Sequence, residues 1–86
     1  MKKIWIGTFE NSEIKIENTW FNGERLFVNN VLQDETYGFV GTKLLGHVID
    51  MQGNKLLIKA NLGGYFYISC RLFVDDRKIE LLESKS

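Results

Sequence analysis

Few side chains in this 86-residue chain could do chemistry, and the first candidates are its single histidine and its single cysteine. His47 and Cys70 could form a nucleophilic pair, in which the imidazole takes the thiol proton. A zinc site on the same two residues would need carboxylates from distant strands, because no second histidine lies nearby. Cys70 alternates with Ile68 and Leu72, the pattern of a small buried hydrophobe. We therefore expect no enzyme, no metal and no cofactor.

The acidic residues offer a second candidate for metal chemistry. Asp75 and Asp76, together with Asp50, could bind calcium through carboxylate oxygens. Neighbouring residues of a strand point to opposite faces, however, so an Asp-Asp pair suits a turn better. The sequence also has no phosphate-binding loop, no dinucleotide-binding glycine pattern and no GxSxG motif.

A binding surface is the stronger candidate, and it falls on the run from Tyr65 to Val74. Tyr65, Tyr67 and Phe73 share one face of this predicted strand, and Arg71 lies between them. We interpret this row as an interface with a protein or a second copy, or as sheet packing. Aromatic rows beside cations also bind single-stranded nucleic acid by base stacking, and a small apolar or sugar-like ligand is a third possibility. Against nucleic acid, the formal net charge is zero and the face carries one arginine.

These side chains must be positioned by strands, because the apolar pattern of the chain repeats every second residue. Ile14 and Ile16 alternate with charged residues, and no segment combines a capping residue with a helical apolar stripe. Turn residues such as Asn22-Gly23 and Gly63-Gly64 separate the runs at intervals of roughly eight to twelve residues. That spacing is typical of a sandwich or a barrel.

One six-residue phrase occurs twice, as RLFVNN at Arg25–Asn30 and RLFVDD at Arg71–Asp76. An Ile-Lys pair precedes each copy, and a short strand follows each, Val31–Gln33 and Lys78–Leu82. The repeat predicts two similar meanders stacked face to face, with Thr42–Asp50 completing the sheets. The expected fold is all-β, a small antiparallel β-sandwich of about eight short strands. A closed β-barrel is the alternative.

We expect a single domain over residues 1–86, with residues 83–86 as a polar tail. The predicted core takes one apolar row from each strand. It consists of Ile4, Ile6, Ile14, Ile16, Trp20, Leu26, Val28, Val48, Leu56, Ile58, Phe66, Ile68, Leu72, Val74, Ile79 and Leu81.

The charge balance argues against polyanion binding, because eleven basic residues offset eleven acidic ones. A neutral chain lacks the broad positive field that captures nucleic acid or anionic lipid. No apolar run reaches the roughly 20 residues of a membrane span, and the start MKKIWIGTFE does not read as a signal peptide. We therefore expect a cytoplasmic protein that does not bind membranes.

Several segments, in their order along the chain, resemble one half of a Fas apoptotic inhibitory molecule. They are Trp5, the IKIE segment, RLFVNN, the GFVG segment and the closing LFVDDRKIEL, and they span roughly Ile4 to Leu81. This chain departs from that family by ending its RLFV strands on Asn-Asn and Asp-Asp turns without glycine, and by having one such unit. The resemblance implies a non-catalytic β-sandwich that acts by protein contact.

The sequence therefore predicts a non-enzymatic protein-interaction module that acts through a sheet edge or an aromatic sheet face. Its partner is another protein or a second copy of the chain. The tentative binding residues are Tyr65, Tyr67, Arg71 and Phe73. Single-stranded nucleic-acid binding on the Tyr65/Tyr67/Phe73 face and small-ligand binding stay open as alternatives.

Overall fold

The computed structural model describes residues 2–19, 23–37, 41–64 and 68–85, and every regular element in these ranges is a strand. The strands are β1 (Lys2–Phe9), β2 (Ser12–Thr19), β3 (Gly23–Val28), β4 (Val31–Thr36), β5 (Thr42–Ile49), β6 (Lys55–Gly63), β7 (Ser69–Val74), β8 (Arg77–Ile79) and β9 (Leu82–Lys85). The described residues contain no helix long and apolar enough to cross a membrane. The all-β prediction is confirmed.

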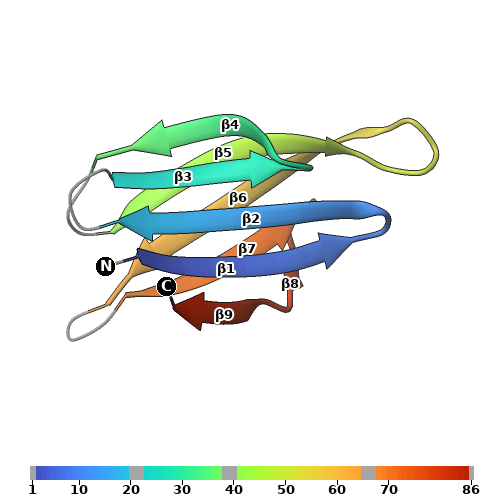
Figure 1. Cartoon of the computed structure of the whole chain (residues 1–86). Helices are drawn as coiled ribbons and strands as arrows, with labels where there is room; N and C mark the ends of the chain where they lie inside the picture. Colours follow the sequence, from blue (N-terminus) through green and yellow to red (C-terminus); the bar gives the residue numbers. More distant parts are fainter. Residues whose placement is uncertain (1, 20–22, 38–40, 65–67, 86) are drawn as a thin grey trace.

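The strands form two antiparallel sheets (Figure 1). The first has the order β4-β3-β2-β1-β9, and the second has the order β5-β6-β7-β8. Each sheet therefore contains one four-stranded meander in chain order, so the predicted pair of meanders is confirmed. The alternative of one closed barrel is wrong, because the described strands divide into two separate ladders.

The repeated phrase encodes a strand and the turn that follows it. Its two copies supply β3 and β7, and each pairs with the next strand through a two-residue turn. Both turn residues have positive φ in each copy, 50° and 67° at Asn29 and Asn30, and 52° and 63° at Asp75 and Asp76. Positive φ at both positions defines a type I′ hairpin, whose twist matches that of the flanking strands. Asparagine and aspartate tolerate this conformation better than other non-glycine residues.

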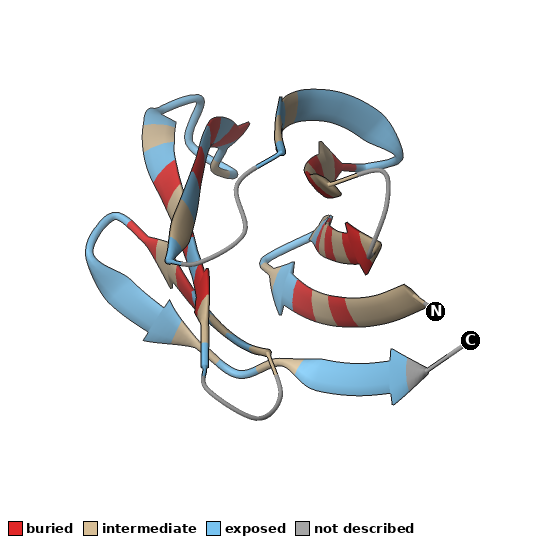
Figure 2. Cartoon of the chain, turned by 90° about the vertical axis from the view of Figure 1, so that its left-hand side faces the viewer, coloured by how far each residue is buried: buried red, intermediate tan, exposed pale blue. Residues whose placement is uncertain are grey.

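One apolar core draws on both sheets (Figure 2). The structure confirms half of the predicted core as buried: Ile14, Ile16, Leu26, Val28, Val48, Ile58, Leu72 and Val74. Four more predicted residues, Leu56, Ile68, Ile79 and Leu81, are partly buried and pack against this core. Trp20 and Phe66 lie outside the described residues. The structure adds Trp5, Leu44, Ala60 and Leu62.

Strand β1 faces the opposite way from the prediction. Trp5 is buried in the core, whereas Ile4 and Ile6 are half-buried on the outer side. All three residues are apolar, so alternation alone could not assign the inner row. Burying the larger indole removes more apolar surface from water, and its N–H donates to Glu83 Oε1 at 3.1 Å.

The C-terminal segment also differs from its prediction. The expected strand Lys78–Leu82 is interrupted, because β8 ends at Ile79 in the second sheet and β9 begins at Leu82 in the first. Residues 83–85 of the expected polar tail therefore belong to a strand that pairs with β1. Contacts between Glu83 and β1 hold it there, including an ion pair with Lys3 at 3.9 Å.

The edges of β4 and β5 are joined by side chains in place of a backbone ladder. Asp34 Oδ2 accepts the N–H of Leu45 at 2.8 Å, and Gln33 Oε1 accepts the N–H of His47 at 2.7 Å. The β3–β4 register shifts so that Leu26 pairs with Asp34 and Phe27 with Leu32, which leaves Gln33 as the extra residue of a bulge. We call these contacts the β4–β5 seam. The seam covers an open sheet edge without closing a barrel.

Gly46 of β5 is required by the seam, because a Cβ there would lie 2.5 Å from Gln33 Oε1 and 2.9 Å from Leu26 Cδ2. We expect Gly46→Ala to lower the free energy of unfolding by about 1–3 kcal/mol, measured by urea denaturation. Gly63→Ala is the matched control, since the nearest atom to its Cβ would be 3.9 Å away. Equal stabilities for the two variants would contradict a close-packed seam.

The I′ turn at Asn29-Asn30 generates a second prediction. Asn30→Gly should keep or raise the unfolding free energy, because glycine adopts positive φ without strain. Asn30→Val should lower it by about 1–2 kcal/mol, because a β-branched residue is strained there. Thermal unfolding of both variants tests this order. A valine variant as stable as the glycine variant would show that positive φ is not required at this turn.

Candidate binding surface

The predicted site residues Arg71 and Phe73 lie on the outer face of β7. Leu72 and Val74 alternate with them and are buried, so Arg71 and Phe73 must point away from the core. Arg71 is exposed and Phe73 is half-buried. Tyr65 and Tyr67, the other two predicted residues, lie outside the described residues.

The register of the second sheet surrounds these two residues with lysines. Phe73 pairs with Lys59 of β6 on one side and with Lys78 of β8 on the other. Lys43 and Lys55 have the same outward orientation on β5 and β6. We call the outward side of these four strands the outer β5–β8 face. A single strand shows only one cation on this face, Arg71, whereas the lysines join it through the register of the neighbouring strands.

Aliphatic side chains lie between the cations on this face. Leu45 is 45 % exposed, Ile49 is 58 % exposed and Leu57 is 38 % exposed. Leu45 pairs with Lys59, and Ile49 pairs with Lys55. The face therefore alternates apolar and positively charged side chains over adjacent strands.

The cations of this face have few carboxylate partners. Lys59 approaches Asp76 at 3.3 Å, and both side chains are well exposed, so this pair contributes little. Within the described part of the chain, Lys43, Lys55, Arg71 and Lys78 have no carboxylate within ion-pair distance. Their positive charge therefore remains available to an external anion.

The outer face of the first sheet is built on the same pattern but is internally neutralised. Arg25 holds the position in β3 that Arg71 holds in β7, and its Nε donates to Glu35 Oε2 at 3.0 Å. This hydrogen bond raises the pKa of Arg25. Arg25 also pairs with Glu17 of β2, whereas Arg71 pairs with the neutral Asn61. The two repeats therefore differ in whether their arginine is matched by acids.

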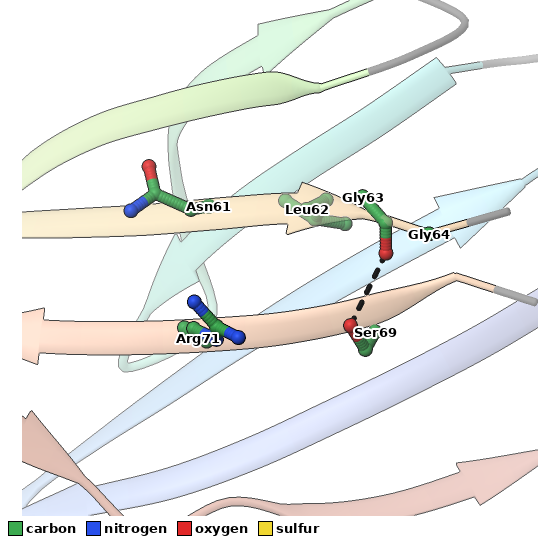
Figure 3. Close-up of a pocket in the computed structure, with 6 residues that line it drawn as sticks. All are labelled: Asn61, Leu62, Gly63, Gly64, Ser69 and Arg71. Atoms are coloured by element: carbon green, nitrogen blue, oxygen red, sulfur yellow. Dashed lines mark hydrogen bonds between the residues drawn. The ribbon is translucent and has the colours of Figure 1, made fainter.

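A cleft of about 330 Å³ opens beside Arg71, at the end of β6 (Figure 3). The described residues that line it are Asn61, Leu62, Gly63, Gly64, Ser69 and Arg71. The hydroxyl of Ser69 donates to the carbonyl of Gly63 at 3.1 Å, which links β7 to the end of β6. Gly63 and Gly64 add no side chain to this lining. A planar carboxylate could therefore approach the guanidinium of Arg71, the geometry that arginine binds best.

The structure does not bring together His47 and Cys70, the pair considered for nucleophilic chemistry. Cys70 is half-buried on the inner phase of β7, and burial raises the pKa of its thiol to about 12. His47 is exposed on the outer phase of β5, and β6 lies between the two strands. The thiol is therefore protonated at neutral pH, and it has no imidazole beside it to act as a base.

The aspartates have structural roles. Asp50 accepts hydrogen bonds from the backbone N–H groups of Asn54 at 2.7 Å and Gln52 at 2.9 Å, and these bonds lower its pKa. Asp75 and Asp76 form the β7–β8 turn. Among the described residues, no group of three potential ligands gathers at a metal site.

No protein-family model, no curated protein and no solved structure matches this chain. The resemblance to the Fas apoptotic inhibitory molecule family therefore stays a prediction, and the function must be argued from the surface itself.

A polar pair is buried near one end of the core. Glu24 of β3 is 5 % exposed, and its Oε2 accepts from Asn18 Nδ2 at 2.7 Å. Its other oxygen, Oε1, has no hydrogen-bond partner in the part of the chain that the structure describes. A cavity of about 10 Å³ lies beside Glu24, which is about the space that one water molecule needs. The pair therefore suits a hydrated structural contact.

Two substitutions separate the roles of charge and hydrogen bonding in this pair. Glu24→Ala should lower the unfolding free energy by about 1–3 kcal/mol, because Asn18 loses its acceptor. Glu24→Gln keeps an acceptor oxygen without a buried charge, so its unfolding free energy should equal or exceed that of the wild type. Chemical denaturation at neutral pH measures both. A glutamine variant as unstable as the alanine variant would mean that the negative charge itself is needed.

Proposed function

We propose that this protein is a β-sandwich that serves as a non-enzymatic protein-interaction module, with the outer β5–β8 face as its contact surface. The sandwich is supported by the single core to which both sheets contribute. Cross-sheet contacts on both sides of the molecule agree with it. A Cβ on Gly46 of β5 would meet Leu26 of β3 in the opposite sheet. A Cβ on Gly7 of β1 would likewise meet Leu72 of β7.

One observation carries the choice of surface: Leu45, Ile49 and Leu57 are exposed together on one sheet face. Single exposed apolar residues are normal, whereas apolar residues gathered on one face often mark an interaction site. Arginine and aromatic residues, which are enriched at interfaces, occur on the same face as Arg71 and Phe73. A second copy of the chain is one form of this partner.

Single-stranded nucleic acid is the second candidate. The observation that favours it is the group of cations around Phe73, since such proteins combine positive charge with aromatic stacking. Phe73 is half-buried, however, which leaves little ring surface for a base.

Site-specific photo-crosslinking tests the contact surface. A photoreactive phenylalanine analogue in place of Leu57 should give discrete protein adducts in the native host. The same analogue in place of Leu32 is the matched control, because Leu32 is 46 % exposed but lies on the first sheet. We expect adducts at position 57 and few at position 32.

Equal labelling at both positions, or no protein adduct at position 57, would contradict the proposed surface. Light scattering of the purified chain identifies the form of the partner. A dimeric mass that returns to the monomer in Leu57→Glu indicates self-association, and a monomer at high concentration indicates a different protein.

A further inference from the structure

We propose that the outer β5–β8 face binds an acidic protein segment, in which carboxylates alternate with aliphatic side chains. This inference rests on the proposed function and adds the chemistry of the partner. It starts from the distribution of charge between the two sheets.

The four strands of the second sheet contain no aspartate or glutamate. Their basic residues are Lys43, Lys55, Lys59, Arg71, Arg77 and Lys78. The first sheet mixes both signs within its strands, as in the ion pairs Lys15–Glu17 at 3.6 Å and Arg25–Glu35 at 3.0 Å. Net neutrality of the chain therefore combines a nearly balanced first sheet, a purely basic second sheet and five acidic residues between the strands, Glu10, Asp50, Asp75, Asp76 and Glu80.

The cations of the second sheet act together. Adjacent strands lie about 4.8 Å apart, which is less than the Debye length of about 8 Å at physiological ionic strength. Lys59 and Lys78 lie on opposite sides of β7, and Arg71, two residues from their shared partner Phe73, is a diagonal neighbour of both at about 7–8 Å. The three charges therefore add to one positive potential and repel one another. An anionic partner would offset this repulsion and would be attracted over a longer range than a neutral one.

The side chains between the cations favour a protein over a nucleic acid. Leu45 and Ile49 each pair with a lysine on β6, so an apolar group lies beside a positive charge across this part of the face. Aliphatic side chains offer no stacking surface to a base, but they can bury aliphatic side chains of a peptide. The complementary surface therefore carries carboxylates beside leucine-like side chains.

The cleft beside Arg71 supports the same chemistry. Gly63 and Gly64 leave space next to the guanidinium, and Asn61 adds a side-chain amide that can donate a second hydrogen bond. A carboxylate in this cleft would be held by charge-assisted hydrogen bonds. The cleft could therefore anchor one acidic residue of the partner, while the lysines and aliphatic residues contact the remainder.

Fluorescence anisotropy with the full chain tests the proposal. The probe is a labelled peptide of about twelve residues in which glutamate alternates with leucine and serine, long enough to cross the sheet. The control peptide has lysine in place of every glutamate. We expect binding of the acidic peptide alone, weakening as salt is raised.

Two charge reversals locate the contact. Lys59 lies at the centre of the face, so Lys59→Glu should weaken peptide binding about tenfold or more. Lys2→Glu makes the same change of net charge on the first sheet and should alter affinity less than about twofold. Circular dichroism of both variants verifies that they are folded.

The remaining outcomes overturn the proposal in distinguishable ways. Tighter binding of an oligothymidylate, with the same loss in Lys59→Glu, would assign the face to single-stranded nucleic acid. Tighter binding to phosphatidylserine vesicles would assign it to anionic lipid. If none of these probes binds, the acidic partner is refuted, whereas adducts at position 57 would still support the contact surface.

Discussion

The apolar core to which both sheets contribute decides what this protein displays to its surroundings. Leu26, Leu44 and Leu72 are fully buried, and strict alternation along a strand turns every neighbour of such a residue outward. The core therefore defines two outer faces at once. The charge and the exposed aliphatic groups follow from that division, since both depend on side chains that the core excludes.

The internal repeat shows how one framework can carry two different surfaces. In both copies a lysine pairs with the phenylalanine of RLFV, Lys15 with Phe27 and Lys59 with Phe73. In the first copy Lys15 lies over the Phe27 ring at 4.8 Å and approaches Glu17 at 3.6 Å. The second copy has asparagine where the first has this glutamate, which leaves Arg71 without an acid opposite. The buried positions keep the fold, while outward positions such as this one change the charge.

Much of the fold could be predicted from the sequence, because local residue patterns determine its central strands and turns. Alternation identified the central strands β2, β3, β6 and β7, and the Asn-Asn and Asp-Asp pairs marked their turns. The inner face of β1 could not be predicted, since Ile4, Trp5 and Ile6 are all apolar. The pairing of β9 with β1 could not be predicted either, because it joins opposite ends of the chain and depends on contacts such as the hydrogen bond from Trp5 to Glu83.

The candidate surface was only partly predictable for a related reason. Arg71 and Phe73 could be recognised within one strand, but Lys59 and Lys78 join them only through the register of the sheet. The formal charge of zero averages over the whole chain, whereas an ion or a carboxylate responds to charges within about 8 Å. The relevant unit of charge is therefore one sheet face. The sequence from Thr42 to Ile79 already indicated this positive charge, since its acidic residues lie in the turns and none lies in a strand. Charge counted strand by strand, with turns set apart, predicts a positive face that the neutral total conceals.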